Sequence, residues 1–350
     1  MTEKRERKLH YDLLRILAAF SVVMLHSAAQ FWYDLDRQST AWLIANSYDA
    51  LFRFGVPIFV MLSGAMFLDP DYPMDLKRLY RHNVLRLIIL YVVWSCAYGL
   101  YDSRLFDFQT VGIKEVLREI LYGRYHLWFL PMIAGIYLLL PVLKSWIMHA
   151  EKKNVQYFLV LFLVLQIGRE TLNSLTVKEE LHYMFNLGKI EMACSYIGYF
   201  VWGYYLAHIG IGEKVRKAFY YLFVPSVILN VLLGNVLTKR VEDFGGIIYD
   251  SFGLFTFVMV TVLFLVAKEQ GSKLTFGKKS SSLIREISAD TLGVYVMHIG
   301  LMEYLMNRGI HSMMIPNIVG IPVFAVFCFA TCTIVAAILR RIPVLGKFLC

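Results

Sequence analysis

Arg15 and His26 stand eleven residues apart in the first long apolar segment, and Asp12 lies one helical turn before Arg15. An ionisable side chain is costly inside a membrane span, so it usually faces the protein interior or a wet cavity and marks a functional path. At about 100° per residue, eleven steps return His26 to within about 20° of Arg15, about 16 Å further along a helix. The spacing predicts a basic group near one membrane surface, in line with a deeper imidazole. The alternative is a snorkelling arginine and a histidine that only packs against another helix.

The composition indicates which elements hold these side chains. Of the 350 residues, 58% are hydrophobic and only 17% are charged, and the mean hydropathy is +0.56. These values are typical of polytopic membrane proteins. At about 20 residues per span there is room for about ten helices and for no sizeable soluble domain. We therefore expect an all-α transmembrane helix bundle that forms one domain over residues 1–350.

Apolar runs between charged or turn-rich breaks predict the spans. They lie near residues 10–33, 47–68, 83–102, 125–148, 154–170, 190–208, 218–236, 247–267, 288–306 and 317–339. The basic residues behind the net charge of +9 concentrate in alternate connections, beginning with the amino terminus. This positive-inside bias predicts that both termini are cytoplasmic, and because no long basic tract occurs we expect no nucleic-acid partner. The five cysteines form no Cys-x-x-Cys pair, so we expect free thiols and no metal site.

Three arginines stand in and just after the connection that follows the second span. Arg81 lies three positions after Arg78, and Arg86 follows at the start of the next span. On an α-helix the first two would project to one side, and guanidinium groups suit bidentate recognition of phosphate. The segment therefore predicts a clamp for a phosphorylated cytosolic ligand. Ordinary topology charge or contact with lipid headgroups is the alternative.

Residues that could bind a second substrate lie near the opposite membrane surface. Arg53 stands close to the membrane surface before the Gly55–Gly64 run, in which Pro57 and small residues favour a kinked packing helix. His126 and Trp128 open the fourth span, and Tyr295 and His298 share one face of the ninth. An aromatic belt also accounts for Trp128, and hydrogen-bonded packing between helices also accounts for His298.

Several of these segments, taken in this order, resemble the acyltransferase-3 family of integral membrane acyltransferases. The matching elements are Asp12-x-x-Arg15-x10-His26, Gly55-Val-Pro-Ile-Phe-Val-Met-Leu-Ser63-Gly64, Arg78-x-x-Arg81, His126-Leu-Trp128-Phe-Leu, Tyr199-Phe-Val-Trp-Gly203-Tyr-Tyr and Leu292-Gly-Val-Tyr295-Val-Met-His298. The stretch from Asn46 to Gly64 is most similar to the branch that contains the enterobacterial common antigen O-acetyltransferase. Some members of the family carry an appended carboxyl-terminal hydrolase-like domain, which we do not expect here.

The resemblance implies a multi-pass enzyme of the bacterial inner membrane. It would move an acyl group, usually acetyl, from a cytosolic thioester donor to a hydroxyl of a surface polysaccharide or a lipid-linked sugar. His26 would be the catalytic base, Arg15 its essential companion with Asp12 beside it, and Arg78 and Arg81 the donor-side arginines. The implied donor is acetyl-coenzyme A, used as a substrate, with no tightly bound cofactor.

The chemistry of the residues is compatible with that activity. A free imidazole has a pKa of about 6.5, so His26 is suited to take a proton from an acceptor hydroxyl near neutral pH. Arg15 is suited either to hold a phosphate of the donor or to polarise the thioester carbonyl. A transporter of an anionic metabolite or glycan precursor, with the same polar stripe lining its path, is the rival hypothesis. The acceptor sugar and the acyl chain length stay open, as does a homo-oligomer.

Overall fold

The computed structural model describes residues 8–102, 114, 121–175, 191–238, 250–342 and 346. Within them every regular element is helical, as the composition predicts. The elements are α1 (Leu9–Ala29), α2 (Thr40–Phe52), α3 (Gly55–Phe67), α4 (Leu76–Arg78), η1 (Leu79–Val84), α5 (Leu85–Asp102), η2 (Tyr125–Trp128), α7 (Phe129–His149), α8 (Lys152–Phe162), η3 (Leu163–Gly168), α9 (Arg169–Leu175), α11 (Glu191–Tyr204), η4 (Tyr205–Ile209), α12 (Glu213–Thr238), α13 (Leu254–Glu269), η5 (Gly271–Lys273), α14 (Lys278–Met306) and α15 (Asn317–Arg341).

The chain crosses the membrane many times. Among the described residues, eight helical stretches are long and apolar enough to span a bilayer. The other two predicted spans correspond to α11 with η4 and to the carboxyl-terminal part of α14. Helix α14 is long enough to span, but polar residues such as Asp290, His298 and Glu303 lower its hydropathy, whereas α11 has only 14 residues.

The second predicted span differs from the structure in its start and in its continuity. It begins at Thr40 rather than near residue 47, because the Ser39 hydroxyl accepts a hydrogen bond from the Trp42 N–H (3.1 Å) and caps the helix. The helix then breaks at Arg53 and Phe54, and α3 begins two residues before Pro57. Proline lacks an N–H and is best accommodated in the first turn of a helix, which agrees with a break just before it.

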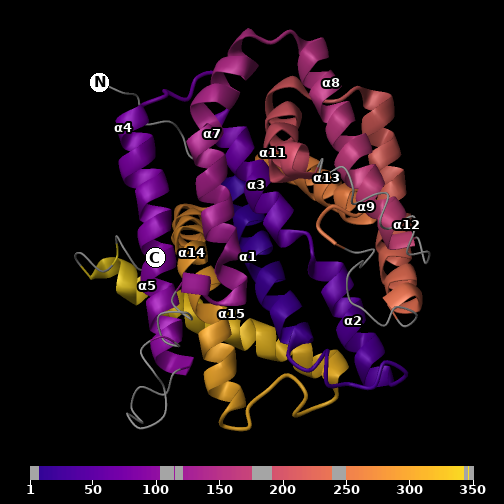
Figure 1. The fold of residues 1–350 in the computed structure, drawn as a ribbon, viewed down its shortest axis with the longest axis vertical. Coiled ribbons are helices and arrows are strands. Elements are labelled where there is room, and N and C mark those ends of the chain that lie inside the picture. The colour runs from indigo at the N-terminus through magenta and orange to yellow at the C-terminus, as the bar shows by residue number, and fades with distance from the viewer. Residues whose placement is uncertain are drawn as a thin grey trace.

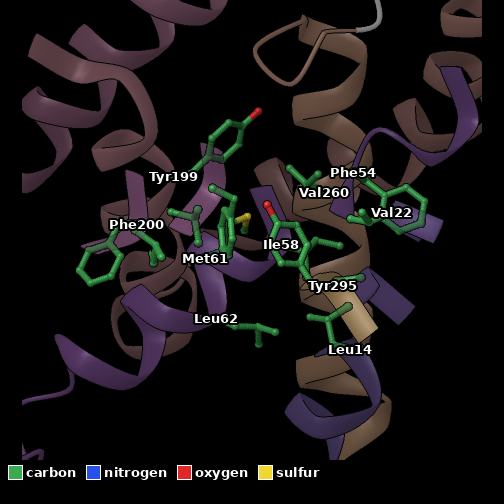
Figure 2. Close-up of a cluster of buried hydrophobic side chains, with 14 of the residues drawn as sticks. Leu14, Val22, Phe54, Ile58, Met61, Leu62, Tyr199, Phe200, Val260 and Tyr295 are labelled. Carbon is green, nitrogen blue, oxygen red and sulfur yellow. The ribbon is translucent and has the colours of Figure 1, made fainter. Parts of the chain in front are cut away.

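Helix α1 occupies the centre of the bundle, where it packs against α2, α3, α13, α14 and α15 (Figure 1). Figure 2 shows buried side chains of α1, α3, α11, α13 and α14 meeting in one cluster. Close packing of α3 on α11 depends on two glycines. A Cβ at Gly64 would lie 1.8 Å from the Phe200 carbonyl oxygen, and one at Gly203 would lie 2.0 Å from that of Met61. Small residues of this kind let two membrane helices approach closely.

Candidate functional site

Three histidines from distant parts of the sequence meet inside the bundle. They are His26 near the end of α1, His126 in η2 and His298 in α14. The His298 ring centroid lies 5.1 Å from that of His26 and 5.3 Å from that of His126. His298 is fully buried, His126 is 2% exposed and His26 is partly exposed. The sequence places these side chains in three separate segments, and the structure brings them into one group, here called the histidine cluster.

Hydrogen bonds between helices hold the cluster in place. The Tyr295 hydroxyl of α14 donates to the backbone carbonyl of His126, which ties η2 to α14. The Tyr98 hydroxyl of α5 donates to the Val296 carbonyl (2.8 Å) and accepts from the Gly300 N–H (2.9 Å). The ring of Tyr98 also lies 5.3 Å from that of His126. Tyr295 therefore fixes the position of His126 in the cluster through its hydroxyl.

The partners of two rings define which nitrogens carry hydrogen. His298 Nδ1 lies 2.7 Å from the Tyr295 carbonyl oxygen and 3.2 Å from that of Val294. His126 Nε2 lies 3.5 Å from the Val296 carbonyl oxygen. Carbonyl oxygens only accept, so these two nitrogens donate, and His298 Nε2 and His126 Nδ1 are left with lone pairs. Both of these unprotonated nitrogens are buried and have no hydrogen-bond partner within the described residues.

A second polar group lies toward the amino-terminal end of α1. The Ser288 hydroxyl of α14 donates to Asp12 Oδ1 (2.7 Å), and Arg15 Nη1 donates to Ser288 Oγ (3.4 Å). Arg15 Nη1 also lies 3.6 Å from Asp12 Oδ1, and Arg15 Nη2 lies 3.3 Å from the sulfur of Met66 in α3. We call Asp12, Arg15 and Ser288 the arginine group. Because Asp12 is only 2% exposed, its charge is available to hold Arg15 rather than to meet solvent.

Both groups face α14, in agreement with the shared face that the spacing of Arg15 and His26 predicts. Arg15 contacts Ser288, and His26 contacts His298, further along the same helix. Helices α1 and α14 therefore run side by side in the same direction, with polar contacts near both ends of the pair. Sequence reasoning overlooked Ser288. The signal for it is its place on the stripe that continues through Tyr295 and His298 on α14.

A comparison with protein families shows which family the chain belongs to. Residues 9–340 match the acyltransferase-3 family model, described as an acyltransferase domain. The chain belongs to the acyltransferase-3 family. The matched range contains the histidine cluster and the arginine group, and the chain is a multi-pass membrane acyltransferase. A search of curated proteins and a search of solved structures each gave no match.

The structure gives two other candidates of this acyltransferase different surroundings. Arg53, at the break between α2 and α3, forms a bidentate ion pair with Asp49 through Nε (3.1 Å) and Nη2 (2.7 Å). Trp128 is 45% exposed, and its ring lies 5.6 Å from that of Tyr196 in α11. Arg53 is therefore held by a neighbouring carboxylate, whereas Trp128 belongs to an aromatic layer beside the histidine cluster.

Tyr125 lies beside the histidine cluster, although it was not among the candidate residues predicted from the sequence. Its ring lies 5.7 Å from those of both His26 and His126. It is 61% exposed, whereas His126 beside it in the chain is buried. Tyr125 thus stands between the histidine cluster and the outside of the protein. The adjacency of an exposed tyrosine and a buried histidine in the Tyr125-His126 pair was the available signal.

Three predicted phosphate-binding arginines lie in and beside the π-helical segment η1. Arg78 ends α4, Arg81 lies in the π-helix η1 and Arg86 lies in the first turn of α5, and all three are exposed. Arg78 and Arg81 thus lie on one helical segment, as predicted, but from Leu79 onward its hydrogen bonds are π-helical, and these widen the turn. Such π-helical turns are frequent at functional sites.

We predict that Ser288→Ala lowers acyl transfer about tenfold and leaves the amount of protein in the membrane unchanged. The substitution removes the hydroxyl that donates to Asp12 and accepts from Arg15, and a hydrogen bond to a charged group contributes about 1.5–3 kcal/mol. The measurement is the initial rate of acyl transfer by membranes with equal amounts of protein. Ser282→Ala, an exposed position on the same helix, is the matched control and should have the wild-type rate.

Proposed function

We propose that this acyltransferase is an O-acetyltransferase. It moves an acetyl group from cytosolic acetyl-coenzyme A to a hydroxyl of a cell-surface polysaccharide or a lipid-linked sugar precursor. We place it in the bacterial inner membrane with both termini in the cytoplasm, as a single domain. The similarity of the Asn46–Gly64 stretch supports a place in the branch of the enterobacterial common antigen O-acetyltransferase.

One observation carries the proposal: the partly exposed imidazole of His26 lies beside buried His298, which also contacts buried His126, and α1 connects His26 to the ion pair of buried Asp12 with partly exposed Arg15. His26 is the group in the cluster that a substrate can reach from outside the core. A neutral imidazole at such a place is suited to general-base catalysis on a hydroxyl. The helix joins this base to a cationic group suited to an anionic donor.

The proposed reaction is direct transfer. His26 takes the proton of the acceptor hydroxyl while the oxygen attacks the thioester carbonyl carbon. The C–O bond forms, the tetrahedral oxyanion collapses, the C–S bond breaks, and the imidazolium returns the proton to the departing thiolate. The products are an acetyl ester and coenzyme A. General acid–base catalysis of this kind typically raises the reaction rate about 10²–10⁴-fold.

The geometry limits the part that Arg15 plays in this reaction. The helix rises about 1.5 Å per residue, so the backbones of Arg15 and His26 lie about 16 Å apart along α1. Two side chains so far apart do not hold the same carbonyl group. We therefore assign Arg15 to the phosphate end of the donor and His26 to the reacting end. Arg78 and Arg81 add phosphate contacts on the cytosolic side, and Arg53, His126 and Trp128 face the acceptor.

The experiment that tests the function is mass spectrometry of surface glycans from a deletion strain and from the same strain carrying the gene again. An acetyl mass on one sugar, absent in the deletion and restored on complementation, is expected. Purified protein should also release coenzyme A from acetyl-coenzyme A when acceptor is present. Glycans that differ in amount but not in acyl mass, together with no use of acetyl-coenzyme A, would favour the transporter.

A further inference from the structure

His298 presents its two ring edges to different helices. Its Nδ1 edge is satisfied by the Tyr295 and Val294 carbonyls, three and four residues earlier on its own helix. The opposite edge, with Nε2, therefore points away from the α14 backbone. In that direction lies α1, which packs along α14, and the His26 ring is 5.1 Å away between centroids. Rings at this separation can bring facing nitrogens within hydrogen-bond distance.

Nε2 of His298 needs a donor. It is buried in a residue with 0% exposure and has no hydrogen-bond partner among the described residues. A buried acceptor without a partner costs about 1–3 kcal/mol, so native proteins seldom leave one. Neutral His26 has one N–H and one lone pair. Its ring contacts His298 and Tyr125, whereas His126 contacts His298 and Tyr98.

We propose that His298 is a positioning residue: when the acceptor binds, the His26 ring turns its N–H toward His298 Nε2, and this hydrogen bond fixes which nitrogen of His26 faces the acceptor hydroxyl. This rests on the proposed role of His26 as the base. With one nitrogen held by His298, the other keeps its lone pair toward the substrate. When His26 takes the proton, the imidazolium keeps its hydrogen bond to neutral His298. His126 Nδ1, the other buried nitrogen without a hydrogen-bond partner among the described residues, is then left to bind a hydroxyl of the acceptor substrate.

Burial explains why the N–H of His26 is directed to His298 rather than to His126. His298 is the most deeply buried of the three imidazoles, so a substrate or water reaches its Nε2 last. His126 follows directly on Tyr125, which is 61% exposed. A substrate entering past Tyr125 therefore meets His26 and His126 first. A group that orients a ligating or catalytic imidazole through its second nitrogen changes activity by about 10–100-fold when it is removed.

Three substitutions of His298 separate its two edges. Glutamine places an acceptor oxygen near the position of Nε2, asparagine replaces only the Nδ1 edge, and leucine replaces neither. We expect His298→Gln to keep at least about one fifth of the wild-type kcat for acetyl transfer. His298→Asn and His298→Leu should both lower kcat about 10–100-fold. KM for acetyl-coenzyme A should change less than about twofold in all three, because His298 does not hold the donor.

The rates are measured on purified protein and divided by the folded fraction, determined from size-exclusion chromatography, so that poor folding does not imitate a loss of positioning. Equal kcat for the glutamine and leucine variants would overturn the proposal. A rise in KM for the acceptor with unchanged kcat would also overturn it and would make His298 a substrate-binding residue. His26→Ala is measured in parallel. An active His26→Ala contradicts the proposed function itself, whereas an inactive His26→Ala with a fully active His298→Leu contradicts only the role of His298.

Discussion

Replacing His26 with alanine is expected to lower acyl transfer at least a hundredfold and to remove acetylation of the surface glycan. His26 is the partly exposed member of the histidine cluster, so it is the imidazole that a hydroxyl can reach. Removal of a general base typically costs about 10²–10⁴ in rate. The measurements are the acetyl content of surface glycans by mass spectrometry and the initial rate of coenzyme A release by purified protein.

The matched control for His26→Ala is His149→Ala. His149 is an exposed histidine at the end of α7, and its Nδ1 contacts only the Ser145 carbonyl of its own helix (2.8 Å) among the described residues. This variant should acetylate like the wild type. Wild-type acetylation by His26→Ala, at a normal level of protein in the membrane, would contradict the assignment of His26 as the base. An inactive His149→Ala would show that the assay responds to loss of any histidine.

The sequence predicts the helices and one face of the first helix well, because both follow from local patterns. Hydrophobic runs place the spans, and the spacing of Arg15 and His26 puts them on one side of α1. The structure agrees, since both side chains contact α14. Periodicity identifies a face, but it does not identify the helix that covers this face. For that reason the pairing of α1 with α14, and with it the contact of Ser288 with Asp12 and Arg15, was not predictable.

The histidine cluster depends on long-range packing in the same way. His26, His126 and His298 come from three separate helical elements, and η2 is a short 3-10 turn that is held against α14 by the Tyr295 hydroxyl. Nothing in the local sequence of η2 specifies that contact. The π-helix at Arg81 and the break at Arg53 were missed for a related reason: hydrophobic patterns assume a regular α-helical turn.

Replacing Arg15 with lysine is expected to lower acyl transfer at least tenfold and to raise KM for acetyl-coenzyme A more than it lowers kcat. Lysine keeps the positive charge beside buried Asp12, so the carboxylate is not left uncompensated, a change that would cost about 3–5 kcal/mol. It loses the planar fork that reaches Ser288, Asp12 and a ligand together. The substitution should therefore weaken binding of acetyl-coenzyme A and leave folding unchanged.

Two further variants test this interpretation of the arginine group. Arg216→Lys changes an arginine that is paired with Glu269 and is 38% exposed, and it should leave both constants unchanged. Asp12→Asn keeps an acceptor for Ser288 but removes the charge that holds Arg15. It should therefore raise KM for acetyl-coenzyme A in the same direction as Arg15→Lys, and the double variant should be little worse than either single one because both changes disturb one contact. A fall in kcat with unchanged KM in Arg15→Lys would instead place Arg15 at the reacting carbonyl, and acyl transfer would then require the donor to lie deeper along α1.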